Sequence, residues 1–291
     1  MNVLIIGAEG QLGQDLCAVY ADSTLHRADL DGDGHQLDIS DADAVNRLIA
    51  RELRPDLVLN AAAAHNVPLC EQEPALAFAV NATGARNLAV ACKAVGARLV
   101  HVSTDYVFGD GGTRPYVESD LPQPLSVYAA SKLAGEHLIA SVLDDHLIVR
   151  TAAIYGNAPC RAKGGRNFIG TMLHLAATRP EVKVVTDEIT TPTYTLALAR
   201  QIRLLAEKGE PGVYHATCRG DCSWFDFARA IFEETDTQVV LSPTTSAEFQ
   251  SPVRRPAYSV LENRHAQAQG LDIMPPWREA LKDYLASRTN A

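Results

Sequence analysis

The first half of the chain alternates short apolar runs with longer segments in which apolar residues recur at helical spacing. The runs are predicted to be buried strands, and the longer segments amphipathic helices. Strands are predicted over 2–6, 25–29, 56–60, 98–103 and 146–150. Helices are predicted over 11–20, 41–53 (with Ser40 as N-cap), 81–95 and 127–141. Apolar strands separated by helices predict a parallel sheet covered on both faces, and right-handed crossovers make the fold a doubly wound α/β fold.

After residue 150 the pattern becomes less regular. Segment 156–167 is predicted to be a loop, and the proline-rich segment 242–258 shows little periodicity. Helices are predicted over 168–178, 194–207, 224–234 (started by Ser223) and about 277–285, and strands over 182–185 and 213–215. We expect residues 1–150, with about 168–205, to form the main domain. Residues 151–167 and 206–291 are expected to form a small α/β C-terminal lobe.

The composition is that of an ordinary globular protein, because 47% of the 291 residues are hydrophobic and 21% are charged. A formal net charge of -9 argues against a nucleic-acid or anionic-membrane binder. No basic leader precedes the first strand, and no apolar run approaches the roughly 20 residues of a membrane span, so we expect a cytoplasmic protein. The six cysteines are too sparse for a disulfide scaffold. Cys218 and Cys222 lie near His215 but lack a second ligand pair, so we expect reduced thiols and no metal.

A glycine-rich loop connects the first predicted strand to the first predicted helix. Its sequence, Gly-Ala-Glu-Gly-Gln-Leu-Gly, has G-x-x-G-x-x-G spacing. Between a strand and a helix, such glycines permit a tight turn, a close approach of the backbone to a pyrophosphate, and close helix packing. The helix N-terminus adds N–H groups and a positive dipole end. We therefore expect a Rossmann-type dinucleotide site, in which the cofactor contacts are Gly7, Gly10, Gln11, Leu12 and Gly13.

An acidic residue at the end of the second strand would bind the ribose hydroxyls of NAD. Asp29 fits this position best, and Asp31, in the solvated loop that follows, is the alternative. A carboxylate there disfavours the 2′-phosphate of NADP, although Arg27 could offset the repulsion. The cofactor is therefore expected to be NADH or NADPH. The other expected cofactor contacts are Asp38, Ile39, Ala61, Ala62 and Ala63.

The clearest chemical signal is a Y-x-x-x-K pair, Tyr128 and Lys132, on a predicted helix. This spacing places both side chains on one helix face, one turn apart. The lysine charge can lower the pKa of the phenol, and the lysine can also hold a ribose. The tyrosine can then pass a proton to a carbonyl oxygen while hydride arrives at the carbon. Thr104 ends the preceding strand, at the edge where open α/β sheets bind ligands, and can hydrogen-bond the same oxygen. Thr104, Tyr128 and Lys132 are the expected catalytic residues.

Together with Asn-Ala-Ala-Ala at 60–63, Ser-Thr-Asp-Tyr-Val-Phe at 103–108 and Arg-Thr at 150–151, these motifs resemble the extended short-chain dehydrogenases. The chain is most similar, over nearly its whole length, to the dTDP-4-dehydrorhamnose reductase family. The resemblance implies an NAD(P)-dependent oxidoreductase that reduces the 4-keto group of a dTDP-linked deoxysugar, converting dTDP-4-dehydrorhamnose to dTDP-L-rhamnose. Its partner is then a nucleotide sugar, and a homodimer is left open. Some members bind magnesium through glutamates that have no match here.

The resemblance also indicates substrate contacts, which are Thr104, Asp105, Asn167, Arg254, Arg255 and His65. The two arginines could clamp a diphosphate by bidentate hydrogen bonds, or be a solvated pair. Asn167 could hydrogen-bond the nucleotide. His65 is either a sugar contact or a structural histidine, and Asp105 could instead fix the turn at the strand end.

Other functions on the same fold remain open at this stage. Ala153 and Pro68 stand where the family usually has an aromatic residue and an aspartate, near the expected sugar site. Epimerases and dehydratases are alternatives, although Tyr106, where a dehydratase has glutamate, weighs against the latter. A non-catalytic regulatory subunit, like the relatives that partner methionine adenosyltransferase, is a further alternative. The complete threonine, tyrosine and lysine set argues against lost chemistry.

Overall fold

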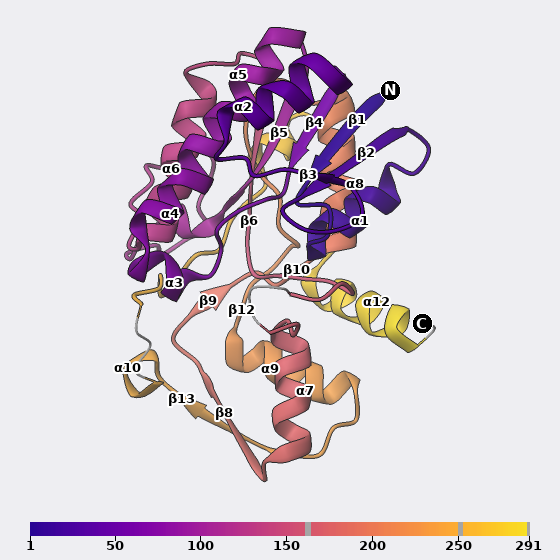
Figure 1. Cartoon of the computed structure of the whole chain (residues 1–291). Helices are drawn as coiled ribbons and strands as arrows, with labels where there is room; N and C mark the ends of the chain where they lie inside the picture. The colour runs from indigo at the N-terminus through magenta and orange to yellow at the C-terminus, as the bar shows by residue number, and fades with distance from the viewer. Residues whose placement is uncertain (161–163, 250–252, 290–291) are drawn as a thin grey trace.

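Seven parallel strands form the centre of the molecule in the order β11-β6-β5-β4-β1-β2-β3 (Figure 1). The structure is a computed structural model and describes residues 1–160, 164–249 and 253–289. The strands are β1 (Asn2–Ile6), β2 (Thr24–Asp29), β3 (His35–Gln36), β4 (Leu57–Asn60), β5 (Arg98–Thr104), β6 (His146–Thr151) and β11 (Gly212–His215). The sheet grows in both directions from β1, which places the topological switch point between β1 and β4. The predicted doubly wound α/β fold is confirmed.

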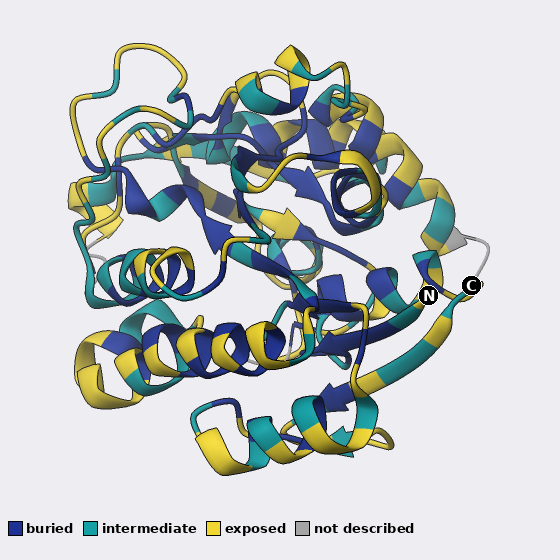
Figure 2. Cartoon of the chain, turned by 90° about the horizontal axis from the view of Figure 1, so that it is seen from above, coloured by how far each residue is buried: buried dark blue, intermediate teal, exposed yellow. Residues whose placement is uncertain are grey.

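Alternate residues of β1 face opposite sides of the sheet, as a strand with two covered faces requires. Val3 and Ile5 belong to one buried cluster, whereas Leu4 and Ile6 belong to another. Helices α1 (Gln11–Val19) and α8 (Thr195–Lys208) cover the first face, and α2 (Ala42–Asn46), α5 (Ala85–Val95) and α6 (Val127–Ala140) cover the second. The buried residues lie between the sheet and the inner sides of these helices (Figure 2).

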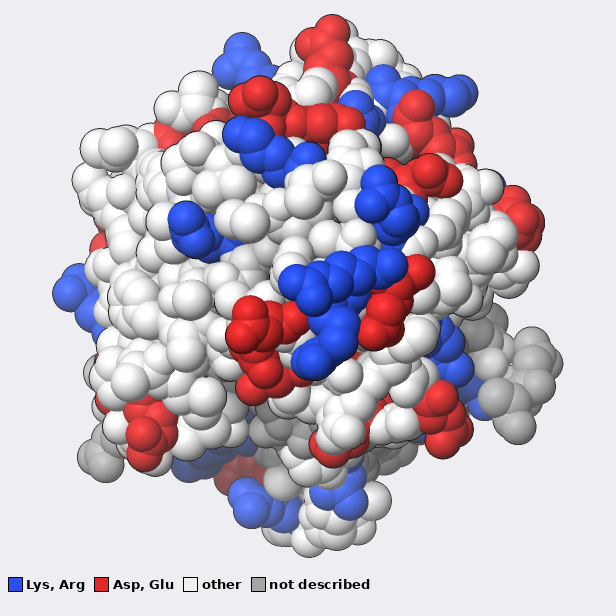
Figure 3. Space-filling model, turned by 45° about the horizontal axis from the view of Figure 1, so that its top comes forward, with Lys and Arg blue, Asp and Glu red and all other residues white. Residues whose placement is uncertain are grey.

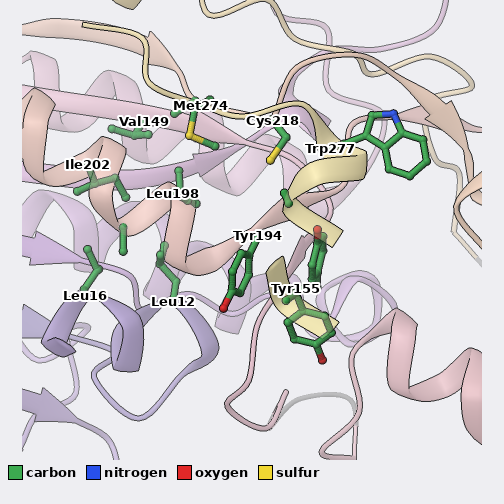
Figure 4. Packing of buried hydrophobic residues seen from close by; sticks show 14 of the residues in the cluster. Leu12, Leu16, Val149, Tyr155, Tyr194, Leu198, Ile202, Cys218, Met274 and Trp277 are labelled. Carbon is green, nitrogen blue, oxygen red and sulfur yellow. The ribbon is translucent and has the colours of Figure 1, made fainter. Parts of the chain in front are cut away.

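Helices α1 and α8 pack against each other and against the sheet. Figure 4 shows Leu12 and Leu16 of α1 lying opposite Leu198 and Ile202 of α8, with Val149 of β6 beside them. All five side chains are buried in one cluster, each at most 4% exposed. This packing fixes the N-terminal end of α1, and with it the glycine-rich loop.

A smaller group of elements lies beneath the carboxyl ends of the strands (Figure 1). It contains α7 (Phe168–Thr178), β8 (Glu181–Val185), α9 (Trp224–Glu234), β13 (Val240–Thr244) and α10 (Ser246–Phe249). β8 pairs in parallel with β13, and both α7 and α9 pack on β8. Two short pairs, β7 (Ile154–Tyr155) with β10 (Thr193–Tyr194) and β9 (Ile189–Thr190) with β12 (Cys222–Ser223), lie where the chain passes between the two parts. The remaining helices are α3 (Val67–Gln72), α4 (Pro74–Phe78), α11 (Arg264–Ala268), α12 (Trp277–Thr289) and the short segments η1 (Arg47–Leu53), η2 (Ala79–Gly84) and η3 (Asp105–Val107).

Side-chain caps explain where several helices start, with one correction. Ser223 begins α9 as predicted, through a capping box in which its side chain accepts the N–H of Asp226 at 3.0 Å. Ser40 is not the N-cap of α2, because its hydroxyl is bonded to Asp38. Asp41 takes that role, since its carboxylate accepts the backbone N–H groups of the next turn. The predicted helix over 41–53 is divided into α2 and the π-helical η1.

The expected division into domains stays a prediction. Two segments, however, pack with a different part of the molecule than the one expected. Strand 213–215, expected in the lobe, lies in the central sheet as β11, paired with β6. Of segment 168–205, α8 packs on the sheet, whereas α7 and β8 pack with α9. β13 is found where an irregular segment was expected. Within the described residues, no helix is both long and apolar enough to span a bilayer.

Charged side chains of both signs are interspersed on the surface, and Figure 3 shows arginine and lysine beside aspartate and glutamate on one face. Several arginines pair with carboxylates. The exposed pairs include Arg27–Glu9, Arg114–Asp120, Arg203–Asp22 and Arg229–Asp226. Such pairs contribute little to stability individually, about 0–1 kcal/mol each, so the fold depends mainly on the buried clusters.

Candidate active site

The glycine-rich loop turns tightly at the end of β1 and leads directly into α1. Gly7 has a φ of 79°, and a Cβ atom on it would lie 2.7 Å from the backbone nitrogen of Ala62. A Cβ atom on Gly13 would lie 2.0 Å from the carbonyl oxygen of Gly7. Gly10 is the N-cap of α1 and has no side chain to bond the free N–H groups. The close backbone contacts explain why glycine is needed at positions 7 and 13, and a dinucleotide phosphate at the start of α1 stays a prediction.

Replacing Gly13 by alanine is expected to destabilise the chain and weaken cofactor binding. The new methyl group would overlap the carbonyl of Gly7, which lies in backbone that cannot move without displacing the loop. Overpacking of this kind costs about 1–3 kcal/mol. Thermal unfolding and titration of cofactor fluorescence would measure the two effects. Gly170→Ala in α7, where the nearest atom lies 3.5 Å away, is the control, and equal effects of both changes would contradict this account.

The side chains of Gln11 and Leu12, which follow Gly10, make contacts within the protein. Gln11 is buried, and its Nε2 donates to the carbonyl of Gly156 at 3.3 Å. Leu12 is in the core beneath the sheet. The predicted cofactor contacts of these two residues therefore have to come from their backbone N–H groups.

Asp29 lies at the end of β2, beside the loop. Its carboxylate accepts the backbone N–H of Glu9 at 3.0 Å and that of Leu30 at 2.8 Å. Arg27 is paired with the carboxylate of Glu9 at 2.5 Å, so its charge is balanced within the protein. The structure thus places Asp29 where the ribose-binding residue was expected, while Asp31 is in the exposed loop beyond it.

The other predicted cofactor residues are divided between surface and core. Asp38 is exposed, and its carboxylate accepts the N–H of Ser40. Ile39 is buried against Gly84 of η2, so it packs rather than faces solvent. The Ala61–Ala62–Ala63 segment is half-buried and continues β4 past the glycine loop, where Ala61 donates to the carbonyl of Ile6 at 2.9 Å. Its small side chains keep this edge of the sheet open to a ligand.

Thr104, Tyr128 and Lys132 are brought together at the carboxyl end of β5. Thr104 is the last residue of β5, and Tyr128 and Lys132 lie one turn apart at the start of α6, which Ser126 caps. Thr104 lies near enough to Tyr128 to lower the pKa of its phenol. Lys132 is 2% exposed, and its Nζ donates to the carbonyl of Val102 at 2.7 Å. The expected juxtaposition is therefore present in the structure.

The electrostatics of the pair differ from the sequence expectation. Burial raises the pKa of Tyr128 well above the value of a free tyrosine, and the influence of Thr104 only partly opposes this. Burial also lowers the pKa of Lys132 to about 8, against a weaker influence of Glu136. The expected lowering of the phenol pKa by the lysine charge is not seen: desolvation has the largest influence on Tyr128, and Lys132 is not among the groups that shift its pKa. Tyr128 is thus held in its protonated form, which suits a proton donor.

Asp105 follows Thr104 directly, and His65 follows the alanine segment at the end of β4. Asp105 is 3% exposed, and it accepts a hydrogen bond from the Thr104 hydroxyl at 3.1 Å. Burial raises the pKa of Asp105 to about 7, although the hydrogen bond from the Thr104 hydroxyl acts in the opposite direction. His65 is exposed, with Nδ1 3.3 Å from the carbonyl of Ala63. Both residues stay candidates for substrate contacts.

The remaining predicted substrate residues have partners within the protein. Arg254 is paired with Asp110 at 2.5 Å, and Arg255 lies 3.9 Å from the carboxylate of Glu188. Both side chains are exposed, at 68% and 38%, so the choice between a diphosphate clamp and a solvated pair stays open. Asn167 caps α7, because its Oδ1 accepts the N–H of Gly170, while its Nδ2 donates to a backbone carbonyl and a tyrosine hydroxyl. With its amide so engaged, any contact of Asn167 with a nucleotide would replace an existing bond.

Two polar groups near the site were missed by the sequence reasoning. Glu136 and Arg150 form a buried ion pair at 2.6 Å, with side chains 4% and 5% exposed, and Ser103 also bonds Glu136. Asn60 and His101 form a buried contact that reaches Lys132. A single polar residue inside an apolar strand was the only signal for these groups, and it does not reveal its partner.

Among the described residues, no cluster of three or more histidine, cysteine, aspartate or glutamate side chains could hold a metal ion. Cys218 and Cys222 are free and buried, and burial raises the pKa of both thiols. Their chemistry is therefore that of inert core residues.

Comparison with known proteins places the chain in a family. The model described as RmlD substrate binding domain matches residues 1–290. A dTDP-4-dehydrorhamnose reductase of Mycobacterium tuberculosis (strain ATCC 25618 / H37Rv) is 42% identical, covering 100% of this chain and 94% of the relative. The spore coat polysaccharide biosynthesis protein SpsK of Bacillus subtilis (strain 168) is 40% identical, covering 100% and 99%.

A solved structure agrees with these relatives over the whole fold. The dTDP-4-dehydrorhamnose reductase of Bacillus anthracis (strain Ames), in complex with NADP, has a TM-score of 0.92 and 36% identity, and the match covers 98% of each chain. The resemblance found in the sequence is confirmed. The chain therefore belongs to the RmlD substrate binding domain family, and dTDP-4-dehydrorhamnose reductases are among its full-length relatives.

Proposed function

We propose that the chain is an NAD(P)H-dependent reductase that converts dTDP-4-dehydrorhamnose to dTDP-L-rhamnose. One observation carries this proposal. Thr104, Tyr128 and Lys132 meet at the carboxyl end of β5, beside the glycine-rich loop, in a chain 42% identical to a dTDP-4-dehydrorhamnose reductase. A threonine, a protonated tyrosine and a lysine form the set that carbonyl reduction requires.

The residues of the glycine-rich loop fit a nicotinamide dinucleotide. Gly7, Gly10 and Gly13 are proposed to bind the pyrophosphate through the backbone of the tight turn, and Asp29, at the end of β2, is proposed for a ribose. A relative of known structure is in complex with NADP. Asp29 favours free ribose hydroxyls, whereas Arg27 at the same edge can turn from Glu9 towards a phosphate, so both NADH and NADPH are proposed as cofactors.

The reaction assigns one task to each catalytic side chain. The cofactor supplies the hydride for the carbonyl carbon. Thr104 turns its hydroxyl from Asp105 to the carbonyl oxygen and orients it by a hydrogen bond, and Tyr128 gives its phenolic proton to that oxygen. Lys132 holds the cofactor ribose with the N–H that it does not use within the protein. Because α6 and β5 are rigid and buried, the three groups are preorganised for this step.

The nucleotide sugar is proposed to lie between the sheet edge and the smaller lobe. Asp105 and His65 are proposed for the sugar, and Arg254 and Arg255 for the diphosphate, which would compete with Asp110 and Glu188. The lobe is proposed to consist of the elements that pack around β8, so that α8 and β11 stay with the cofactor domain. We propose a cytoplasmic location, because both reactants are charged nucleotides that do not cross a bilayer unaided, and a homodimer remains a further proposal.

Purified protein is expected to consume reduced nicotinamide only when dTDP-4-dehydrorhamnose is present. The substrate would be generated in place, and the absorbance band of NADH or NADPH would be followed. Loss of signal in both the complete and the substrate-free mixture would mean non-specific oxidation. Binding of cofactor without any substrate-dependent loss would contradict the proposed function and favour a regulatory subunit.

A further inference from the structure

The glycine-rich loop carries one charged residue, Glu9, and its side chain is held on two sides. Oε1 of Glu9 lies 2.5 Å from Nη2 of Arg27 in β2. The loop that follows β2 closes on the other side, where a Cβ atom on Gly32 would lie 2.8 Å from Cγ of Glu9. The Glu9 side chain is 21% exposed and that of Arg27 is 42% exposed. The carboxylate is thus fixed in place, while the guanidinium stays accessible to a ligand.

The backbone of Glu9 connects this ion pair to the residue proposed for the ribose. Its N–H donates to Oδ2 of Asp29 at 3.0 Å, and Oδ1 of Asp29 accepts the N–H of Leu30 at 2.8 Å. Each carboxylate oxygen has more than one lone pair, so Asp29 can accept further hydrogen bonds from ribose hydroxyls. A ribose bound to Asp29 would therefore be a neighbour of Glu9.

Carboxylates outnumber cations at this end of β2. With histidine counted as neutral, segment 27–34 contains three aspartates and one arginine, and Glu9 adds a fourth carboxylate. Asp31 and Asp33 are exposed, so water and salt screen their charges. Glu9 and Asp29 are the two that contact each other beside Arg27. Their combined charge exceeds that of the single guanidinium.

A phosphate on the 2′-hydroxyl of the ribose would bring close to two further negative charges to this edge. It requires a guanidinium or ammonium that can form charge-assisted hydrogen bonds with it. Arg27 is the cation at hand, but its charge is already balanced by Glu9. If the guanidinium turned to the phosphate, the Glu9 carboxylate would be left without its partner, next to a second anion.

We infer that Glu9 determines the cofactor preference: by holding Arg27 it disfavours the 2′-phosphate, so the chain binds NADH more tightly than NADPH. The inference rests on the dinucleotide site of the proposed function and ranks its two cofactors. Breaking an exposed ion pair costs little by itself. The discrimination therefore comes mainly from the carboxylate that remains beside the phosphate.

The thiol of Cys17, in α1, lies near the pair but does not change its charge. Burial raises the pKa of Cys17, and Arg27 and Glu9 act on that pKa in opposite directions. A protonated thiol is at most a weak hydrogen-bond donor, so it cannot take the place of a cation for a phosphate. The balance between Glu9 and Arg27 thus decides how this edge receives a ligand.

Binding measurements on the full chain would test the inference without any reaction. Titrations that follow nicotinamide fluorescence are expected to give a lower Kd for NADH than for NADPH. Calorimetry is expected to rank 5′-AMP above adenosine 2′,5′-bisphosphate in the same way. Tighter binding of the phosphorylated member of either pair would overturn the inference. Both rankings are independent of the sugar, so they can hold even where the proposed substrate is not reduced.

A Glu9→Gln variant keeps the size of the side chain and removes its charge. Arg27 is then free to bind the phosphate, and the ratio of NADPH affinity to NADH affinity is expected to rise by about tenfold or more. The control is Glu207→Gln, which removes the same charge from an exposed pair with Arg203 in α8. An unchanged ratio in Glu9→Gln, or an equal rise in Glu207→Gln, would contradict the assignment.

An Arg27→Gln background shows whether Glu9 acts through the arginine. With no guanidinium to release, adding Glu9→Gln is expected to raise the affinity ratio by less than about threefold, the part that comes from lost repulsion alone. A rise as large as in the chain that keeps Arg27 would refute the proposed role of the pair. Thermal unfolding of each variant is expected to stay close to that of the parent, because the exposed pair contributes little to stability.

Discussion

Replacing Tyr128 by phenylalanine is expected to lower turnover of the 4-keto sugar by roughly 10²–10⁴-fold, the usual contribution of a positioned acid. The phenol is the proposed proton donor, and desolvation raises its pKa and keeps it protonated. Phenylalanine keeps the ring and its packing, so cofactor affinity and the unfolding temperature should change little. Steady-state rates with either reduced nicotinamide, together with cofactor titration, would measure this.

Tyr106→Phe is the control for that experiment. The two tyrosine rings are in edge contact, with centroids 6.2 Å apart, so the control removes a hydroxyl from the same environment. The turnover of this variant should stay within about tenfold of the parent, because Tyr106 is not proposed to donate a proton to the substrate. Retained turnover in Tyr128→Phe, or an equal loss in both variants, would exclude Tyr128 as the acid.

Replacing Arg150 by leucine is expected to destabilise the chain by about 3–5 kcal/mol. The guanidinium makes a two-pronged contact with Glu136, at 2.6 Å and 3.1 Å, where neither side chain is more than 5% exposed. Removing one partner leaves a buried charge without compensation. Denaturant unfolding followed by circular dichroism would give the free energy of unfolding.

Two further variants separate a buried-charge effect from lost packing. In the Glu136→Leu/Arg150→Leu double variant neither charge remains, so most of the stability should return. Arg114→Leu, which breaks an exposed pair with Asp120, should cost less than about 1 kcal/mol. A double variant as unstable as the single one would show that packing, rather than charge, explains the loss.

The regular part of the fold follows from local sequence patterns. Apolar runs predicted β1 and the other long strands, and helical spacing predicted α7 and α9 with their observed bounds. Helices α3 and α4 were missed because Pro68 and Pro74 look like breaks, although proline is tolerated in the first turn of a helix. β13 contains Pro243 and has no pattern of its own, because its pairing with the distant β8 creates it.

Site residues could be predicted where they belong to one local sequence motif. They could not be predicted where their role depends on a partner far away in the chain. Tyr128 and Lys132 share one helix face, so their spacing reveals them. The side chain of His101 contacts that of Asn60, which lies opposite it in the neighbouring strand β4. Sequence periodicity does not specify the register that pairs them. The partners of Arg254 and Arg255 likewise come from segments far away in the chain.

Strand β11 also constrains how the chain can fold. β6 ends at Thr151, and its outer neighbour β11 begins at Gly212. The chain between them must be synthesised before β11 can pair with β6 and complete the sheet. Closing so long a loop is entropically costly and delays the contact. Until then β6 presents an open edge, the kind of surface at which chains aggregate. We therefore expect the central sheet and the elements that pack around β8 to fold together, because the first 150 residues alone lack the strand that covers the edge of β6.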